Sequence, residues 1–217
     1  MVKNRCVIVG ASPAANAEFI EKMIQQSDFV ICADGGRDII AKTSITPDLI
    51  IGDMDSSSDT KVFESIPTKI LPVIKDDTDT MYCVKTALSM GFERFLLLGT
   101  IGGRMDHTLA NLSVLLYLRN HNAEGAIISE YEEITLLDSG VNVISDVKGK
   151  TISVMPFACE RIKLSYNGLF YPLKEAAVTA EYPYTISNKA VENEIEITVH
   201  EGKALLIINK ELFINNF

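Results

Sequence analysis

The first half of the chain alternates short apolar runs with segments of helical spacing, and this alternation constrains the fold more than any other feature. The apolar runs occupy residues 6–10, 29–33, 49–52, 70–74 and 95–99. Uninterrupted runs of this length are typical of strands buried on both faces. Between them, apolar residues recur at helical spacing, as at Leu109, Leu112 and Leu116. This alternation predicts a parallel sheet with helices on both faces.

After about residue 123 the pattern changes to one strand after another. Residues 194–200 alternate apolar and polar side chains, as a strand with one solvated face should. Similar short runs occupy residues 126–129, 134–137, 141–144, 151–155, 162–164 and 204–208. No helix of normal length fits between them. We therefore predict an α/β domain over residues 1–124 and an antiparallel sandwich or half-barrel over residues 125–217.

The charge of the chain narrows the partners that it can have. The chain holds 20 Lys and Arg against 29 Asp and Glu, a formal charge of −9. Such an acidic chain is not expected to bind nucleic acid in general, because phosphate backbones are held by clustered Lys and Arg. No apolar run approaches the roughly 20 residues of a membrane span, and the N-terminus lacks the layout of a signal peptide. We therefore expect a cytoplasmic protein without a membrane partner.

The aspartates gather where the predicted strands end. Residues 1–125 hold 11 Asp and 5 Glu, whereas residues 126–217 hold 2 Asp and 11 Glu. Polar segments follow the predicted strands at residues 34–37, 53–56, 76–79 and 102–107. The carboxyl ends of parallel strands share one edge of a sheet, and ligands bind in the crevice along that edge. We therefore expect one acidic edge of the sheet to carry the chemistry.

Asp53 and Asp55 lie two residues apart, just after a predicted strand. Both carboxylates can point at one divalent cation, and Mg²⁺ prefers carboxylates together with phosphate oxygens and water. The three Asp within residues 76–79 exceed what capping a helix needs, and a cation would relieve their mutual repulsion. We expect Asp79 to complete a magnesium site with Asp53 and Asp55. The alternative is an Asp-rich turn in which Asp55 or Ser56 caps a helix.

Two glycine-rich turns lie on the same edge. Gly35 and Gly36 follow Asp34 where a strand turns into a helix, which lets a ligand approach the backbone N–H groups closely. A second turn, at residues 99–104, ends in Arg104, whose guanidinium suits bidentate contact with phosphate. Neither turn has the full dinucleotide-binding or P-loop pattern. With the acids they predict a nucleoside triphosphate and its magnesium, although each turn alone would also fit a tight strand-to-helix connection.

Four motifs, in this order, resemble the thiamine pyrophosphokinase family. They are A-D-G-G at residues 33–36, P-D-x-I-x-G-D-x-D-S at 47–56, D-x-T-D at 76–79 and G-x-x-G-G-R-x-D-H at 99–107. Residues 168–173 and 186–188 resemble the family's thiamine-binding segments, so the resemblance covers nearly the whole chain. It implies an α/β catalytic domain joined to a β-sandwich domain for thiamine binding and dimerisation. It also implies a homodimer with active sites between subunits, and transfer of a pyrophosphoryl group from ATP to thiamine with release of AMP.

Carried over motif by motif, the resemblance implies a role for individual residues. Magnesium would be held by Asp53, Asp55 and Asp79. ATP and its phosphates would meet Asp34, Gly35, Gly36, Arg37, Thr78, Gly102, Gly103, Arg104 and His107. Catalysis would involve Asp77, Arg104 and Asp106, and thiamine would contact the aromatic face of Tyr171 and the polar groups of Ser187 and Asn188. The chain departs from the family pattern at Met54, where an aromatic residue is usual, and at Lys189, where an acidic residue is common.

Some assignments keep alternatives. His107 either contacts the ligand or simply occupies the first turn of a helix. Our hypothesis for Asp106 is that it orients or deprotonates the hydroxyl group of thiamine. Two other classes of function also fit the acidic edge: a magnesium-dependent nucleotidyl- or glycosyltransferase that uses the D-x-D pair, and a non-enzymatic protein that binds a small ligand.

Overall fold

Two compact units, Met1–Glu130 and Tyr131–Phe217, divide the chain in the computed structural model. The structure describes residues 5–53, 63–72, 74 and 76–212. No helix in these described ranges is long and apolar enough to cross a membrane.

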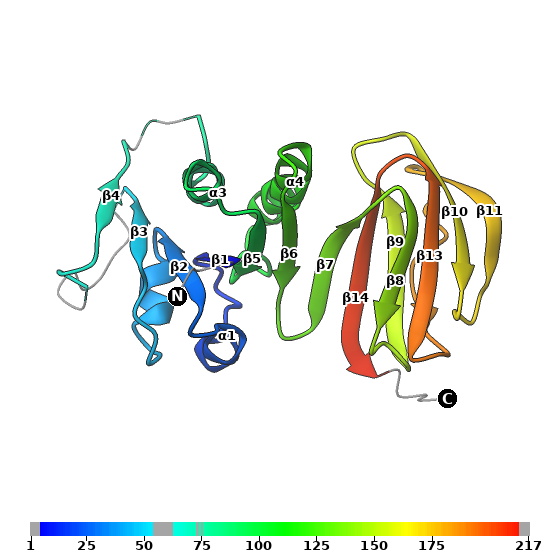
Figure 1. Ribbon diagram of the computed structural model, residues 1–217, viewed down its shortest axis with the longest axis horizontal. Coiled ribbons are helices and arrows are strands. Elements are labelled where there is room, and N and C mark those ends of the chain that lie inside the picture. The colour runs from blue at the N-terminus through cyan, green and yellow to red at the C-terminus, as the bar shows by residue number, and fades with distance from the viewer. Residues whose placement is uncertain (1–4, 54–62, 73, 75, 213–217) are drawn as a thin grey trace. The chain divides into compact units, whose positions relative to one another are not determined.

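The first unit is built on a sheet of parallel strands (Figure 1). Its strands are β1 (Arg5–Val9), β2 (Asp28–Ala33), β3 (Leu49–Gly52), β4 (Thr68–Ile70), β5 (Arg94–Leu98) and β6 (Glu124–Ile128). They lie in the order β6-β5-β1-β2-β3-β4, and each neighbouring pair is parallel. Helices α1 (Ala17–Met23), α2 (Gly36–Ile40), α3 (Asp79–Ser89) and α4 (Met105–Asn120) connect them. We expected the run at residues 126–129 in the all-β half, but β6 pairs in parallel with β5.

Helices cover both faces of this sheet, which explains the continuous apolar runs. Val7 and Val9 of β1 pack in one cluster with Ile20 of α1 and with residues of α2. Cys6 and Ile8 point to the opposite face and are fully buried there. Helices α3 and α4 pack together on that second face, away from α1 (Figure 1). Both sides of each central strand are therefore apolar, as predicted.

The buried face of α4 differs from the one that the sequence predicts. The buried residues are Asn111, Val114, Leu115 and Leu118, whereas Leu109 is 56% exposed. Asn111 occupies a buried position because its Nδ2 donates to the carbonyl of Thr100 at 2.6 Å. Counting only apolar side chains missed this polar member, so the expected stripe lay on the wrong side of the helix.

The second unit is an antiparallel β-sandwich. One sheet has the order β12-β9-β14-β7, with bounds Asn188–Lys189, Lys150–Pro156, Ala204–Leu212 and Glu132–Leu137. The other has the order β11-β10-β13-β8, with bounds Leu173–Thr179, Arg161–Asn167, Glu194–Glu201 and Gly140–Ser145. Ile152 and Val154 from the first sheet and Leu164 and Ile197 from the second share one buried cluster. The predicted fold class, an α/β unit followed by an all-β unit, is confirmed.

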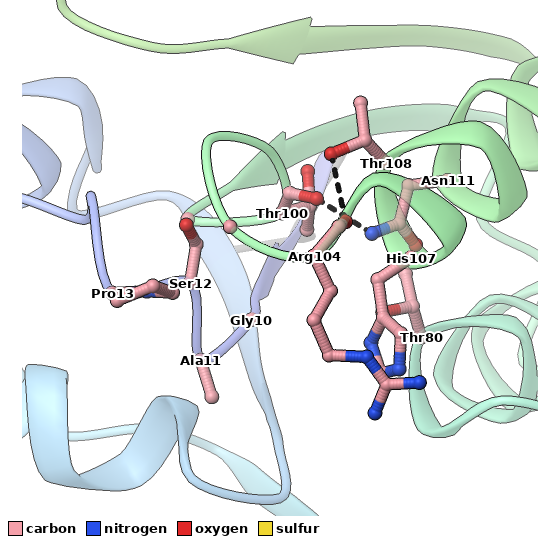
Figure 2. A pocket seen from close by; sticks show the side chains of 12 residues that line it. Gly10, Ala11, Ser12, Pro13, Thr80, Thr100, Arg104, His107, Thr108 and Asn111 are labelled. Atoms are coloured by element: carbon pink, nitrogen blue, oxygen red, sulfur yellow. Dashed lines mark hydrogen bonds between the residues drawn. The ribbon is translucent and has the colours of Figure 1, made fainter.

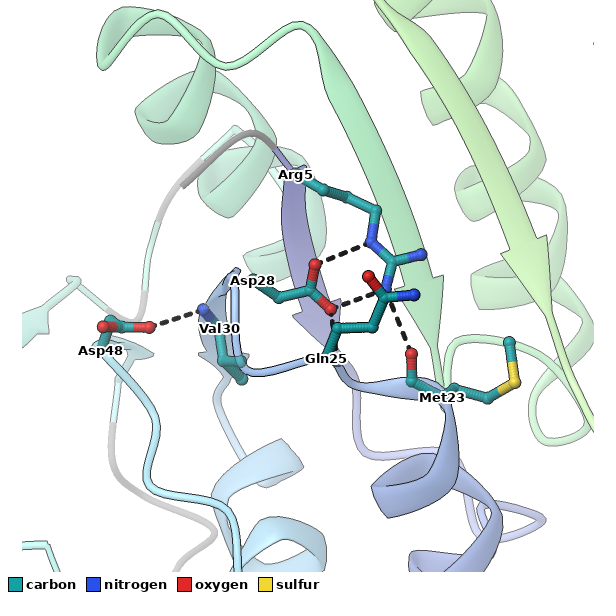
Figure 3. A network of polar contacts seen from close by, with 6 residues as sticks. All are labelled: Arg5, Met23, Gln25, Asp28, Val30 and Asp48. Atoms are coloured by element: carbon teal, nitrogen blue, oxygen red, sulfur yellow. Dashed lines mark hydrogen bonds and ion pairs between the residues drawn. The ribbon is translucent and has the colours of Figure 1, made fainter. Parts of the chain in front are cut away.

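An ion pair between Arg5 and Asp28 ties the amino ends of β1 and β2 together (Figure 3). Arg5 Nε and Nη2 donate to the two carboxylate oxygens of Asp28 at 2.9 and 2.6 Å. Arg5 also donates to the carbonyl of Met23, and Asp28 accepts the N–H of Gln25. The carboxylate is buried, while a quarter of the Arg5 side chain is exposed. The pair joins both strands to the end of α1, at the edge opposite the predicted site.

Replacing Asp28 with alanine should lower the free energy of unfolding by about 3 kcal/mol, because the change leaves the Arg5 guanidinium without its buried partner. Urea denaturation of the purified protein measures this loss. Glu18→Ala removes an exposed pair with Lys22 and should leave the midpoint nearly unchanged. Equal losses in the two variants would contradict a structural role for the buried pair.

Candidate active site

The strand order opens a crevice between the carboxyl ends of β1 and β5. The chain leaves β1 toward α1 on one face of the sheet and leaves β5 toward α4 on the other. Connections that diverge at such a switch point leave room for a ligand. A cavity of about 360 Å³ lies there. Figure 2 shows residues 10–13 on one side of it and the start of α4 with Thr80 on the other.

The two loops that meet at this cavity are bonded to each other through their main chains. The N–H of Gly10 donates to Leu98, and the N–H of Ser12 donates to Gly99, both at 2.9 Å. The Ser12 hydroxyl donates to the carbonyl of Ile101 at 2.6 Å. A Cβ atom on Gly10 would lie 2.7 Å from the Gly99 carbonyl oxygen, so only glycine permits this approach. The two loops thus form one wall of the cavity, joined by these bonds.

The glycines predicted to face the phosphates also have a packing role. A Cβ atom on Gly102 would lie 2.7 Å from Cβ of Ala14, and one on Gly103 would lie 2.8 Å from Pro13. The turn after β5 therefore rests directly on the loop after β1. Gly103 lines the cavity as well. Because Gly103 has no side chain, the two loops can touch and space remains for a ligand.

Helix α4 starts at the cavity without a side-chain cap. Arg104 occupies the position before the first residue, Met105, and makes no capping bond. The first N–H groups of a helix lack intrahelical acceptors, and the helix dipole favours an anion near them. In α4 the N–H of His107 donates to Asp106 Oδ1 at 3.0 Å, so this group is already engaged. Arg104 lines the cavity beside these groups, and its side chain is largely exposed. Together they form a place suited to phosphate.

Asp106 is held by Arg104. Arg104 Nε and Nη2 donate to the two oxygens of Asp106 at 3.1 and 2.5 Å. This hydrogen-bonded pairing lowers the pKa of Asp106, and it raises the pKa of Arg104. Asp106 therefore keeps its negative charge to a lower pH than an ordinary aspartate, which makes it a weak base.

A second, more acidic cavity of about 300 Å³ adjoins the first and shares its His107 wall. Asp34, Thr78 and Asp79 line it. Asp34 directly follows β2 in a left-handed conformation, with φ of 46°. A Cβ atom on Gly52 would lie 2.7 Å from Cα of Asp34, so the missing side chain lets Asp34 turn into the cavity rim.

The predicted magnesium ligands are only partly within the described chain. Asp53 follows β3 and is half-buried, Asp79 is the first residue of α3, and Asp55 lies outside the described residues. Across the described ranges, no group of three or more His, Cys, Asp or Glu is close enough to hold a metal. Two carboxylates, Asp34 and Asp79, nevertheless line one cavity. Such hard oxygen donors fit Mg²⁺.

The aspartates just before α3 are not needed to cap the helix. Thr78, not an aspartate, caps the helix, because its hydroxyl accepts the N–H of Met81 at 3.2 Å. Asp77 accepts two bonds from Lys85 Nζ, at 2.8 and 2.7 Å. The predicted catalytic Asp77 is thus engaged by a lysine of the helix that follows it, α3.

The site residues predicted in and before helix α2 lie in different environments. Gly35 is the residue before the helix, and Gly36 packs against β1 so closely that a Cβ atom would lie 2.0 Å from the Val9 carbonyl oxygen. Arg37 is 7% exposed and lines neither cavity. The packing of α2 buries this guanidinium instead of presenting it at the cavity.

The second unit has a pocket of its own, of about 310 Å³. It is lined by Tyr166, Tyr171, Leu173, Tyr184, Thr185, Ile186 and Asn188. Two residues predicted to bind thiamine, Tyr171 and Asn188, are therefore in its wall. Ser187 lies between wall residues in a left-handed conformation, with φ of 57°, which is uncommon for a residue with a side chain. Burial raises the pKa of the Tyr166 phenol, which keeps it protonated.

Several residues that line the first cavity belong to none of the predicted site motifs: Ser12, Pro13, Thr80, Thr100 and Asn111. The one available signal was Gly10 at the end of an apolar run. Its importance depends on β1 lying beside β5, which no local pattern reveals. Thr100 is of special interest because its hydroxyl is buried and has no hydrogen-bond partner among the described residues.

Comparison with known proteins gives one consistent result for both units. The family model for the catalytic domain of thiamin pyrophosphokinase matches residues 20–127. The model for the vitamin B1 binding domain of thiamin pyrophosphokinase matches residues 139–204. Together they cover most of the chain, and they confirm the resemblance seen in the motifs.

Individual relatives agree. Thiamin pyrophosphokinase 1 of Caenorhabditis elegans is 24% identical over 95% of this chain and 88% of its own length. Thiamine pyrophosphokinase of Bacillus subtilis is 25% identical over 82% of this chain and 85% of its own. The crystal structure of a Bacillus subtilis thiamine pyrophosphokinase superposes with a TM-score of 0.86, at 24% identity, over 96% of this chain and 100% of that one. The yeast thiamin pyrophosphokinase structure gives 0.81 at 16% identity, over 99% of this chain and 88% of that one. Neither alternative class of function finds support in these relatives.

Replacing Gly36 with alanine should destabilise the protein by about 3 kcal/mol, because the new methyl group would overlap the main chain of Val9. Thermal or urea denaturation measures the change. Alanine normally favours a helix over glycine by about 1 kcal/mol, so the two effects have opposite signs. A stabilised variant would contradict the close approach of α2 to β1.

Proposed function

The chain belongs to the thiamin pyrophosphokinase family, and from that premise we propose that it transfers the pyrophosphoryl group of ATP to the hydroxyl group of thiamine. The products are thiamine diphosphate and AMP. The observation that carries this proposal is the cavity at the switch point, where Arg104 and the start of α4 meet two loops that are joined by main-chain hydrogen bonds. Such a site supports a polyphosphate.

ATP binds, in this proposal, along the carboxyl edge of the sheet. Its phosphates lie against Gly103, Arg104, His107 and the start of α4, which border the cavity. Gly102 belongs to the same turn, although it is not part of the cavity wall. Asp34, Thr78 and the turn at residues 35–36 border the nucleotide from the adjoining cavity. Arg37 is buried and lines neither cavity, so in this proposal it does not contact the nucleotide.

Magnesium is part of the proposal. Asp53, Asp55 and Asp79 would hold it, and the two carboxylates of the acidic cavity support a cation there. When bound, Mg²⁺ neutralises charge on the phosphate oxygens. Asp77, held by Lys85, shapes the turn that carries Asp79.

The reaction is an in-line displacement at the β-phosphorus of ATP. The hydroxyl oxygen of thiamine forms a bond to this phosphorus and its proton passes to solvent. The bond to the bridging oxygen of the α-phosphate breaks, so that the electron pair leaves with AMP. Catalysis of this chemistry rests mainly on positioning and on neutralising charge. Arg104 and the start of α4 stabilise the charge on the transferred group. Asp106 accepts a hydrogen bond from the attacking hydroxyl and orients it, since its lowered pKa makes it a weak base.

Thiamine is a cation with two rings, and its recognition requires aromatic surface and negative charge. Tyr171 offers an exposed ring in the pocket of the second unit, beside Ser187 and Asn188. The Asp-rich edge of the first unit suits a cation electrostatically. Tyr171, Ser187 and Asn188 form the proposed thiamine site of the second unit.

Three further parts of the proposal follow from the family. Residues 1–124 act as the catalytic domain for ATP and Mg²⁺, and residues 125–217 act as the domain for thiamine binding and dimerisation. The protein works as a homodimer, which light scattering after size-exclusion chromatography tests. The cytoplasm stays the predicted compartment.

Incubation of the protein with ATP, Mg²⁺ and thiamine tests the reaction. We expect AMP and thiamine diphosphate in equal amounts, and no AMP when thiamine is omitted. Release of ADP or of free pyrophosphate would overturn the proposal, because each marks a different bond broken in ATP.

Asp106→Asn should reduce turnover by about a hundredfold or more, since the amide cannot stabilise the attacking hydroxyl as a carboxylate does. The KM for ATP should change little. Steady-state kinetics with both substrates varied separates these effects. Asp138→Asn makes the same chemical change in the second unit, away from the described cavities, and should keep full activity. Normal turnover in Asp106→Asn would remove Asp106 from the mechanism.

A further inference from the structure

The side-chain amide of Asn188 is bonded to the main chain of Tyr171 through both of its ends. Asn188 Oδ1 accepts the N–H of Tyr171 at 3.0 Å, and Nδ2 donates to the carbonyl of Tyr171 at 2.8 Å. Oδ1 also accepts the N–H of Lys189 at 2.9 Å. A carboxamide has two acceptor sites and two donor hydrogens, so these bonds leave one N–H for any other partner. The side chain is 4% exposed, which limits what that N–H can reach.

These bonds continue an antiparallel pairing between residues 168–171 and 188–191. The pairing consists of a bridge between Leu169 and Ala190, a bond from the Phe170 N–H to the Lys189 carbonyl at 2.9 Å, and a bond from the Val191 N–H to the Gly168 carbonyl at 3.0 Å. At the next position of the pairing, Tyr171 meets a side chain instead of a main chain. The amide of Asn188 acts there as a substitute peptide group.

The main chain cannot fill that position because it turns away at Ser187. Ser187 is left-handed, and its N–H donates to the hydroxyl of Ser153 on β9 at 2.9 Å. Asn188 itself pairs with Ile152 of the same strand. The segment is thus fixed to β9 on one side, and the Asn188 amide transmits this fixed position to Tyr171 on the other.

The ring of Tyr171 needs such support. It is 64% exposed, and it makes an edge contact with Phe170, whose ring is also mostly exposed, at 4.9 Å between centroids. Exposed side chains of this kind are weakly restrained by packing. The ring lines the pocket of the second unit, where its orientation determines whether a flat ligand can stack on it.

We propose that Asn188 is a positioning residue that fixes the Tyr171 ring for stacking, and that it acts on the substrate through Tyr171 and not by direct contact. The effect of Asn188 on thiamine binding rests on the proposed function, whereas its effect on the Tyr171 ring does not. This positioning role takes the place of the direct contact between Asn188 and the pyrimidine that the family resemblance implies.

The mobility of the ring can be measured without substrate. The chain contains no tryptophan, so Tyr171→Trp introduces a single fluorescent reporter at this position. Adding Asn188→Asp removes the Nδ2 donor and places a carboxylate oxygen against the Tyr171 carbonyl. We expect lower anisotropy and acrylamide quenching that is higher by about twofold, because the ring moves on the nanosecond timescale. Asn122→Asp, an exposed site in the first unit, makes the same change of charge and should alter neither quantity.

Kinetics of the unlabelled protein test the consequence for the substrate. Asn188→Asp should raise the KM for thiamine by about threefold to tenfold, the range expected for a lost stacking contact, with the KM for ATP unchanged. In a Tyr171→Ala background the same change should add less than about twofold, because coupled residues are not additive. Asn188→Ser repeats the fluorescence and the kinetic measurements without the added charge, in case the carboxylate prevents folding.

The outcomes separate the two proposals. If Asn188→Asp raised the KM for thiamine by equal factors in the Tyr171 and Tyr171→Ala backgrounds, the positioning role would be overturned. Direct contact between Asn188 and thiamine would then be the better explanation. Unchanged anisotropy and quenching in both Asn188 variants would also overturn it. A mobile ring in a protein that makes no AMP from thiamine and ATP would keep the positioning role while the proposed reaction fails.

Discussion

The close approach of two main chains, at Gly10 and Gly99, is the constraint on which the rest of the first unit depends. Gly10 and Gly99 lack side chains where the loops after β1 and β5 approach each other, so main-chain bonds form from Gly10 to Leu98 and from Ser12 to Gly99. This contact fixes the direction in which the turn at residues 99–104 leaves the sheet. The turn at residues 99–104 then determines where α4 starts and where Arg104 lies. One contact between two glycines thus sets the geometry of the cavity.

Much of the fold could be predicted because it follows from local patterns. Runs of buried residues and turns at their ends determine strands, and alternation with helices determines a parallel sheet. The buried face of α4 could not be predicted in this way. Asn111 is polar, and it is buried only because the Thr100 carbonyl, eleven positions earlier in the chain, accepts its amide. A bond between distant segments overrides the local rule that polar residues stay outside.

In the candidate site, the positions of residues could be predicted from the sequence but their contacts could not. Residue type and position after a strand were enough to place Asp34, Asp79 and Arg104 on cavity walls. They were not enough to show what each side chain touches. Asp77 is engaged by Lys85 of the helix that follows it, and Asp106 by Arg104 two residues earlier. The acidic excess is therefore partly neutralised where it is densest, and the acids that remain open to a ligand are fewer than the sequence suggests.

Loops that are bonded to each other before any ligand arrives change the thermodynamics of binding. A flexible phosphate loop must lose conformational entropy when it closes on its ligand, and that loss weakens affinity. Here the bonds from Gly10 and Ser12 have already removed that freedom during folding. The entropy is lost once, when the chain folds, and is not lost again at each turnover. If this wall binds the nucleotide as proposed, exchange there should resemble the docking of a rigid body, with a rate that follows encounter and desolvation and not loop closure.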